Sequence, residues 1–99
     1  MKPFTLTFAA KTDLKDIALF TQRRWGKEQR NVYLKQFDTS FRLLAKNPDI
    51  GKSCAEIRES YRKFPQGSHI IFYLQTGSQQ IKVIRILHKC MDVNPVFGA

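Results

Sequence analysis

Long apolar runs are missing from this 99-residue sequence, and it has few cysteines. The longest unbroken apolar stretch covers residues 70–74, far short of the roughly 18 residues that a membrane-spanning helix needs. No internal repeat or low-complexity segment occurs. Two cysteines, Cys54 and Cys90, allow one disulfide, but no apolar signal core follows Met1, which favours the reducing cytosol over an oxidising compartment. We therefore expect free thiols in a cytoplasmic protein with no membrane segment.

Acidic residues are also scarce. The chain has 8 Asp and Glu against 17 Lys and Arg, which gives a net charge of +9 and an isoelectric point near 10.0. The excess is spread along the chain, because residues 1–50 carry 10 basic and 5 acidic side chains and residues 51–99 carry 7 and 3. This pattern favours a folded domain with a basic surface over a disordered basic arm. It predicts an acidic partner, whether a nucleic acid or a protein.

Clusters with the spacing of metal or phosphate sites are missing as well. Cys54, His69, His88 and Cys90 are scattered, without the close pairs that zinc sites use, and no glycine-rich phosphate loop is present. Ser68 precedes His69, but neighbours along a strand point to opposite faces, so a turn hydroxyl and a strand histidine are favoured over a catalytic pair. We expect no metal and no cofactor.

The apolar periodicity that is present predicts a strand followed by an antiparallel helical hairpin. Residues 4–8 alternate strictly between apolar residues and threonine, as in a half-buried strand. Thr12 followed by Asp13 is typical of a helix start, and Gly26 is suited to ending that helix. A second helix is predicted over residues 27–46, ended by Asn47 and Pro48. The predicted inner stripes are Leu14, Ile17, Ala18, Thr21 and Trp25 in the first helix and Tyr33, Leu34, Phe37, Phe41 and Leu44 in the second.

The last third of the sequence reads as a meander of three strands. They are predicted over residues 61–64, 69–75 and 81–88, with turns at 65–68 and 76–78. Residues 54–60 show no period and are interpreted as irregular or as a short helical turn. Together these elements predict one α+β domain over residues 1–99, with a tail from about residue 90. Its two layers are a helical hairpin and a sheet.

A set of basic residues on the predicted sheet is the most informative candidate site: Arg58, Arg62, Lys63, Arg85, His88 and Lys89. If Arg62 and Arg85 share a face, they can bind phosphates, with His88 placed for proton transfer. The competing interpretation is that Arg85 pairs with Glu56 or Glu59 and that His88 only ends a strand. The aromatic residues are mostly assigned to the core, which leaves few rings for stacking on bases.

The order of elements and several short motifs resemble the ParE branch of the RelE/ParE toxin superfamily. In the helical hairpin and its exit, the motifs are Asp13-Leu14 with Ile17, Trp25-Gly26 and Asn47-Pro48-Asp49-Ile50-Gly51. In the sheet, they are Arg62, the stretch from Gly67 to Tyr73, Arg85-Ile86-Leu87-His88-Lys89 and Met91-Asp92. The resemblance covers roughly residues 4 to 92. It implies a RelE-like β-α-α-β-β-β fold with an antiparallel sheet and the first strand beside the last.

The same resemblance implies the toxin of a type II toxin-antitoxin pair, neutralised in a hetero-oligomer by a ParD-like antitoxin with an acidic or amphipathic segment. ParE members poison DNA gyrase, whereas RelE members cleave messenger RNA on the ribosome. A nuclease here would depend on Arg62, Arg85 and His88, and the tail over residues 93–97 has no tyrosine, which favours the gyrase inhibitor. A nontoxic basic binding module of the same fold is the third hypothesis. The expected target-binding residues are Arg58, Arg62, Arg85, His88, Lys89, Met91 and Phe97.

Overall fold

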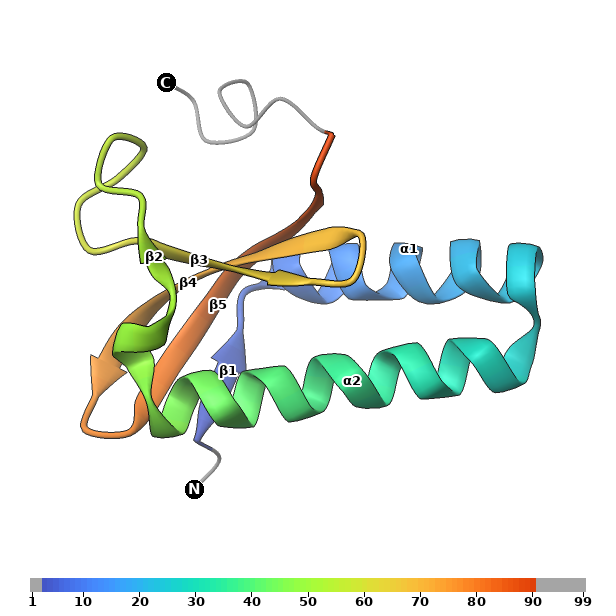
Figure 1. Ribbon diagram of the computed structural model, residues 1–99, viewed down its shortest axis with the longest axis horizontal. Helices are drawn as coiled ribbons and strands as arrows, with labels where there is room; N and C mark the ends of the chain where they lie inside the picture. The colour runs from blue at the N-terminus through green and yellow to red at the C-terminus, as the bar shows by residue number, and fades with distance from the viewer. Residues whose placement is uncertain (1–2, 91–99) are drawn as a thin grey trace.

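The computed structural model describes residues 3–90 and contains a helical hairpin and a five-stranded sheet (Figure 1). The elements in chain order are β1 (Phe4–Leu6), α1 (Phe8–Trp25), α2 (Lys27–Lys46), the short 3-10 helix η1 (Pro48–Ile50), β2 (Lys52–Ser53), β3 (Arg62–Gln66), β4 (His69–Gly77) and β5 (Gln80–His88). Apart from the added η1 and β2, this is the predicted order. Residues 54–60 form turns between β2 and β3. Neither helix is long and apolar enough to cross a membrane.

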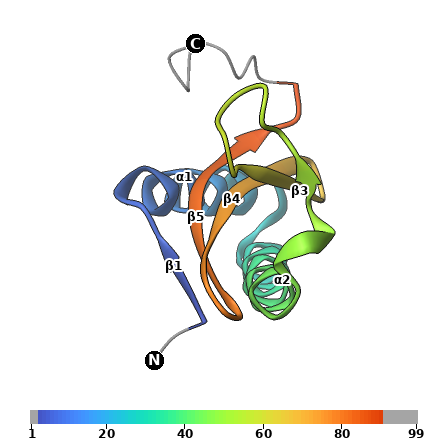
Figure 2. The same ribbon diagram turned by 90° about the vertical axis from the view of Figure 1, so that its left-hand side faces the viewer.

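The strands lie in the order β1-β5-β4-β3-β2, which can be followed from β1 to β3 across Figure 2. The last four strands pair antiparallel, and β1 lies beside β5 as predicted. However, β1 runs parallel to β5, with Phe4 opposite Ile81 and Leu6 opposite Val83, so the sheet is mixed and the expected antiparallel pairing fails at β1. An antiparallel pair can be closed by a tight hairpin, whereas β1 and β5 are separated by most of the chain and no turn dictates their direction.

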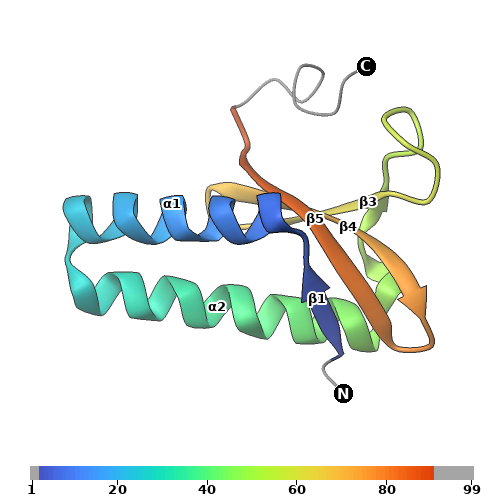
Figure 3. The same cartoon turned by 180° about the vertical axis from the view of Figure 1, so that it is seen from behind.

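The two helices form the predicted antiparallel hairpin, and α2 has the predicted bounds (Figure 3). Gly26 separates them with a φ of 94°, a region that glycine enters without the steric cost of a Cβ atom. Its backbone N–H donates to the Gln22 carbonyl and completes the end of α1. At the other end, Asn47 donates to Leu43 and Pro48 stops α2.

The start of α1 differs from the prediction, because the helix begins at Phe8 and is capped by Thr7, not by Thr12. Thr7 Oγ1 accepts a hydrogen bond from the Ala10 N–H at 3.0 Å and donates to the Ile84 carbonyl at 2.7 Å. Thr12 lies inside the helix and donates back to the Phe8 carbonyl. The contact between Thr7 and β5 fixes the helix start, so β1 ends at Leu6 and Phe8 is exposed instead of continuing the strand.

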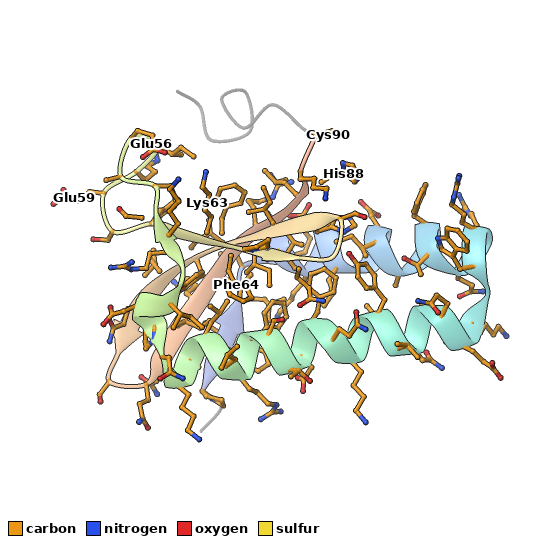
Figure 4. All side chains as sticks on the ribbon, in the orientation of Figure 1. Glu56, Glu59, Lys63, Phe64, His88 and Cys90 are labelled. Atoms are coloured by element: carbon orange, nitrogen blue, oxygen red, sulfur yellow. The ribbon has the colours of Figure 1, made fainter. Side chains whose placement is uncertain are left out.

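The core lies between the helical hairpin and the sheet. It joins Phe37, Phe41 and Leu44 of α2 to Ile71 and Tyr73 of β4 and to residues of β1 and β5. The opposite face of the sheet carries a smaller buried cluster of Cys54, Phe72 and Leu87, with Ile57, Tyr61, Ile70 and Ile84 packed against it. Figure 4 shows the alternation in β3, where Phe64 points toward the helices and Lys63 points away from them.

Candidate functional site

The register of β4 and β5 places two histidines side by side at one end of the sheet. His69 begins β4, His88 ends β5, and the two residues are direct cross-strand partners. Their rings meet edge to face, with centroids 5.4 Å apart. His69 lies two and four residues before Ile71 and Tyr73, which face the helices. Because strand side chains alternate between faces, both histidines lie on the helix side of the sheet.

Tyr33 of α2 connects this strand end to the helical hairpin. Its hydroxyl lies 2.7 Å from His69 Nδ1 and 3.1 Å from the Gln66 carbonyl, and it accepts a hydrogen bond from the Ser68 N–H at 3.2 Å. Gly67 stands over the same ring with a φ of 59°, and a Cβ atom there would lie 2.6 Å from the Tyr33 hydroxyl. The β3–β4 turn is therefore held against α2 by one phenol group.

Burial shifts the pKa values of His69 and Tyr33. It lowers the pKa of His69 below its ordinary value of 6.5, and the charge of nearby His88 lowers it further. Burial also raises the pKa of Tyr33, partly opposed by the hydrogen bond from Ser68. At neutral pH, His69 is thus an uncharged imidazole beside a protonated phenol.

A groove of about 700 Å³ runs from the histidine pair toward the tip of the helical hairpin. Two helices and the β3–β4 turn form its walls. The lining residues are Asp16, Ile17, Phe20, Thr21 and Trp25 of α1, Gln29 and Tyr33 of α2, Gly67 and Ser68 of the turn, His69 and His88. Polar groups gather at its sheet end, and large apolar groups lie along α1. Such a combination is typical of binding grooves.

Two large aromatic side chains on α1 are unusually exposed for their size. Phe20 is 61% and Trp25 65% exposed, and both line the groove. The prediction that Trp25 belongs to the core is wrong, because the hairpin extends past the sheet near Gly26 and no strand lies beneath its tip (Figures 1 and 3). Phe20 was not predicted as a groove residue. The sequence did indicate an exposed ring at this position, because Phe20 lies outside the apolar stripe of Leu14, Ile17 and Thr21.

Arg85, a predicted site residue, is engaged in an ion pair within the protein. Its Nε lies 2.6 Å from Asp13 Oδ2 and its NH2 nitrogen 2.8 Å from Asp13 Oδ1. The hydrogen bonds that Arg85 donates to the Asp13 carboxylate raise the pKa of Arg85 above its usual value. The expectation of a pair with Glu56 or Glu59 is wrong, because those residues lie on the loop between β2 and β3 (Figure 4), whereas α1 runs beside β5.

Arg62 is engaged elsewhere. It donates to the Gly51 carbonyl at 2.8 Å and lies 3.8 Å from the Asp49 carboxylate, so it holds the segment that leads from η1 into β2. Arg62 pairs with Tyr73 and Arg85 pairs with Phe72, and consecutive residues of β4 point to opposite faces. The expectation that Arg62 and Arg85 share a face is therefore wrong.

Three further predicted residues, Arg58, Lys63 and Lys89, lie apart from one another in the structure. Arg58 is exposed in the turns between β2 and β3, and Lys63 is on the sheet face away from the helices. Lys89 is exposed just after β5, and its N–H donates to the Ser68 carbonyl at 3.1 Å. Met91 and Phe97 lie outside the described residues. Within residues 3–90, no three His, Cys, Asp or Glu side chains gather in a way that could hold a metal ion.

Comparisons with known proteins agree on one family. A family model described as "ParE toxin of type II toxin-antitoxin system, parDE" matches residues 4–93. The chain is 43% identical over 91 residues to Toxin ParE1 of Mycobacterium tuberculosis, covering 92% of this chain and 93% of that protein. It is 35% identical over 98 residues to Toxin ParE1 of Caulobacter vibrioides, covering 99% and 100% of the two chains. A solved structure from a chromosomal ParDE system of P. aeruginosa shares the fold, with a TM-score of 0.71 at 16% identity over 86% of this chain and 92% of the other.

Proposed function

The chain belongs to the ParE family of toxins of type II toxin-antitoxin systems, and from this premise we propose that it blocks replication by poisoning DNA gyrase. A ParD-like antitoxin neutralises it by occupying the groove between the helical hairpin and the β3–β4 turn. The alternative target is messenger RNA on the ribosome, as in RelE proteins. The separation of Arg62 from Arg85 is the observation that favours gyrase.

RNA cleavage through the 2′-hydroxyl needs a base, an acid and positive charge at the phosphate, all within hydrogen-bond reach. Arg62 and His88 are placed opposite Tyr73 and His69, which are four residues apart along β4, or about 13 Å at the usual strand rise. Arg85 has two of its nitrogens bound to Asp13. The two arginines predicted for a nuclease thus bind groups within the protein and stabilise the fold. This arrangement supports a toxin that binds its target over one that cleaves RNA.

Poisoning a topoisomerase needs no catalytic set. A protein that binds the cleaved gyrase–DNA state more tightly than the closed state shifts the population toward the cleaved state. The stretch from Arg85 to Phe97 remains the proposed contact, with Lys89 exposed within it and Met91 and Phe97 outside the described residues. The net charge of +9 favours approach to a DNA-bound enzyme.

The target is tested with purified gyrase and relaxed plasmid in one arm and translating ribosomes in the other. We expect the free toxin to block supercoiling or to accumulate cleaved DNA, and we expect no new messenger cuts by primer extension. Lys89→Ala and Phe97→Ala should weaken the effect on gyrase. New messenger cuts that disappear in His88→Ala, with gyrase unaffected, would reverse the assignment.

The exposed rings of Phe20 and Trp25 support the antitoxin site. A contiguous exposed apolar surface rimmed by polar groups marks an interaction site in soluble proteins. A groove bounded by two helices suits the apolar face of an amphipathic helix. The positive charge of the toxin attracts an acidic partner and speeds its association.

This docking site is tested with the product of the neighbouring small reading frame. Phe20→Asp should abolish co-purification, whereas Phe8→Asp should not, because Phe8 is 86% exposed but does not line the groove. Fluorescence of the single tryptophan, Trp25, should change on complex formation. Equal loss of binding in both variants would argue against the groove.

A further inference from the structure

The tip of the helical hairpin concentrates positive charge. Arg23, Arg24, Lys27 and Arg30 lie within eight consecutive residues, with Glu28 as the one acidic residue among them. Arg23, Arg24 and Lys27 are exposed. Within residues 3–90, none of these four basic side chains forms an ion pair with a carboxylate. The tip is therefore a basic surface suited to an anionic ligand.

An exposed aromatic ring lies among these charges. The Trp25 side chain is 65% exposed, and the Arg24 guanidinium lies over its ring, 5.6 Å from the centroid. The hairpin extends past the sheet here, so no strand covers the indole (Figures 1 and 3). Exposed rings beside basic side chains are the combination with which proteins bind unstacked bases, because the ring stacks on the base while the cations bind phosphates.

We propose that the hairpin tip binds the open end of a DNA duplex, with Trp25 stacked on the terminal base pair and Arg23 and Lys27 on the flanking phosphates. Inside an intact duplex every base is stacked between its neighbours, whereas a cleaved duplex has a free base face at each end. A ring that stacks only on the open end stabilises the cleaved state and not the closed one. This inference rests on the proposed gyrase target and adds how the toxin distinguishes the two DNA states.

The same ring connects DNA binding to neutralisation. Trp25 lines the groove that we assign to the antitoxin, together with Phe20 of the same helix. An antitoxin helix in this groove covers the indole and supplies acidic side chains near the basic tip. DNA and antitoxin therefore exclude each other at the tip, so a bound antitoxin prevents the contact with a DNA end.

The test uses the free full-length protein and two DNA duplexes of equal length and sequence. One duplex has open ends, and in the other both ends are bridged by ethylene glycol linkers. Trp25 is the single tryptophan, so quenching of its fluorescence reports stacking, while the anisotropy of labelled DNA reports affinity. We expect the open duplex to quench Trp25 in a saturable way and to bind about tenfold more tightly than the bridged one.

Variants separate stacking from general charge. Trp25→Ala should remove the preference for the open duplex, whereas Trp25→Phe, which keeps an aromatic ring, should retain most of it. Arg23→Gln should reduce the slope of log affinity against log salt by about 1. Lys46→Gln removes the same charge about 28 Å away at the other end of α2 and should leave the end preference unchanged. Circular dichroism checks that each variant is folded.

Three results would overturn the DNA-end site. They are equal binding of the two duplexes, equal losses of affinity in Arg23→Gln and Lys46→Gln, and quenching of Trp25 by polyglutamate as strong as that by open DNA. The last result would assign the tip to an acidic protein.

Assays with purified gyrase separate this inference from the proposed function. We expect Trp25→Ala to accumulate about tenfold less cleaved DNA than the wild type at equal concentration. A variant as active as the wild type overturns the stacking contact and leaves the gyrase target intact. A wild type that leaves gyrase unaffected overturns the target instead, and the two duplexes then decide the DNA contact on their own.

Discussion

Asp13 and Arg85 are 72 positions apart in the sequence and meet in a two-point ion pair that fastens α1 to the last strand. The same carboxylate accepts the backbone N–H of Ile86 at 3.0 Å. Since β1 pairs only with residues 81–83, this part of β5 has no strand beside it on that edge. Asp13 thus accepts hydrogen bonds both from the Arg85 guanidinium and from a backbone N–H on the unpaired edge of β5.

Replacing this aspartate should destabilise the protein. Asp13 and Arg85 are only 12% and 28% exposed in their side chains, so Asp13→Asn should lower the free energy of unfolding by about 1–3 kcal/mol. Asp38→Asn breaks the more exposed pair with Arg42 and should cost less than about 1 kcal/mol. Urea denaturation measures both, and equal losses would contradict the structural importance of the Asp13 contact.

The start of α1 gives a second pair of variants. Thr7→Ala removes the cap and its contact with Ile84, and should cost about 0.5–2 kcal/mol. Thr12→Ala should be nearly neutral, since Thr12 is exposed inside the helix and alanine is the better helix former. Thermal melts followed by circular dichroism distinguish them. A larger effect at Thr12 would restore the helix start predicted from the sequence.

Variants at Phe37 and Phe20 distinguish a role in core packing from a role in antitoxin binding. Phe37 is fully buried, so Phe37→Ala should cost about 3–5 kcal/mol. Phe20→Ala should leave stability within about 0.5 kcal/mol and weaken antitoxin binding, because its ring is mostly exposed in the groove. Denaturation of the free toxin and titration with antitoxin provide the two measurements. A large loss of stability in Phe20→Ala would place that ring in the core.

The lowered pKa of His69 predicts a pH-dependent stability. In the folded state His69 binds its proton less readily than in the unfolded state, where its pKa is near 6.5. Its contribution is therefore present above about pH 6.5 and is lost as the pH falls through the lower folded-state pKa. Urea midpoints measured from pH 7.5 to pH 5 should decline for the wild type.

The matched variants are His69→Gln, which should remove this part of the decline, and His88→Gln, which should reduce it. The second effect follows because His88 contributes the smaller share of the lowered pKa, after burial. An unchanged slope in His69→Gln would mean that another group causes the decline.

Local signals were enough to predict α2. Gly26 and Pro48 act on their own backbone, and the stripe through Phe37 and Leu44 repeats at the helical period, so all of this information lies within the segment. The start of α1 could not be found in this way. Thr7 caps the helix while it binds the Ile84 carbonyl, which is 77 positions away, and a local reading favours the Thr12-Asp13 pair instead.

The candidate site was predicted less well for a related reason. The His69–His88 pair depends on strand register, and the partner of Arg85 depends on which element lies along the free edge of β5. Neither the strand register nor the element beside β5 can be predicted from the spacing of residues in the sequence. Trp25 was misplaced because periodicity identifies an apolar stripe but not where the opposing layer ends.

The parallel pairing of β1 with β5 also determines which native contacts can form while the chain is still being synthesised. The helical hairpin is local and can form early, but β1, the Thr7 hydroxyl and Asp13 find their partners on β5 only after residues 81–86 have left the ribosome. Until then β1 has no strand beside it, because β5 is the strand that pairs with it. A chain released before β5 would leave Phe4, Thr7 and Asp13 without their native contacts to β5. The finished toxin surface is thus assembled only when the two ends of the domain meet.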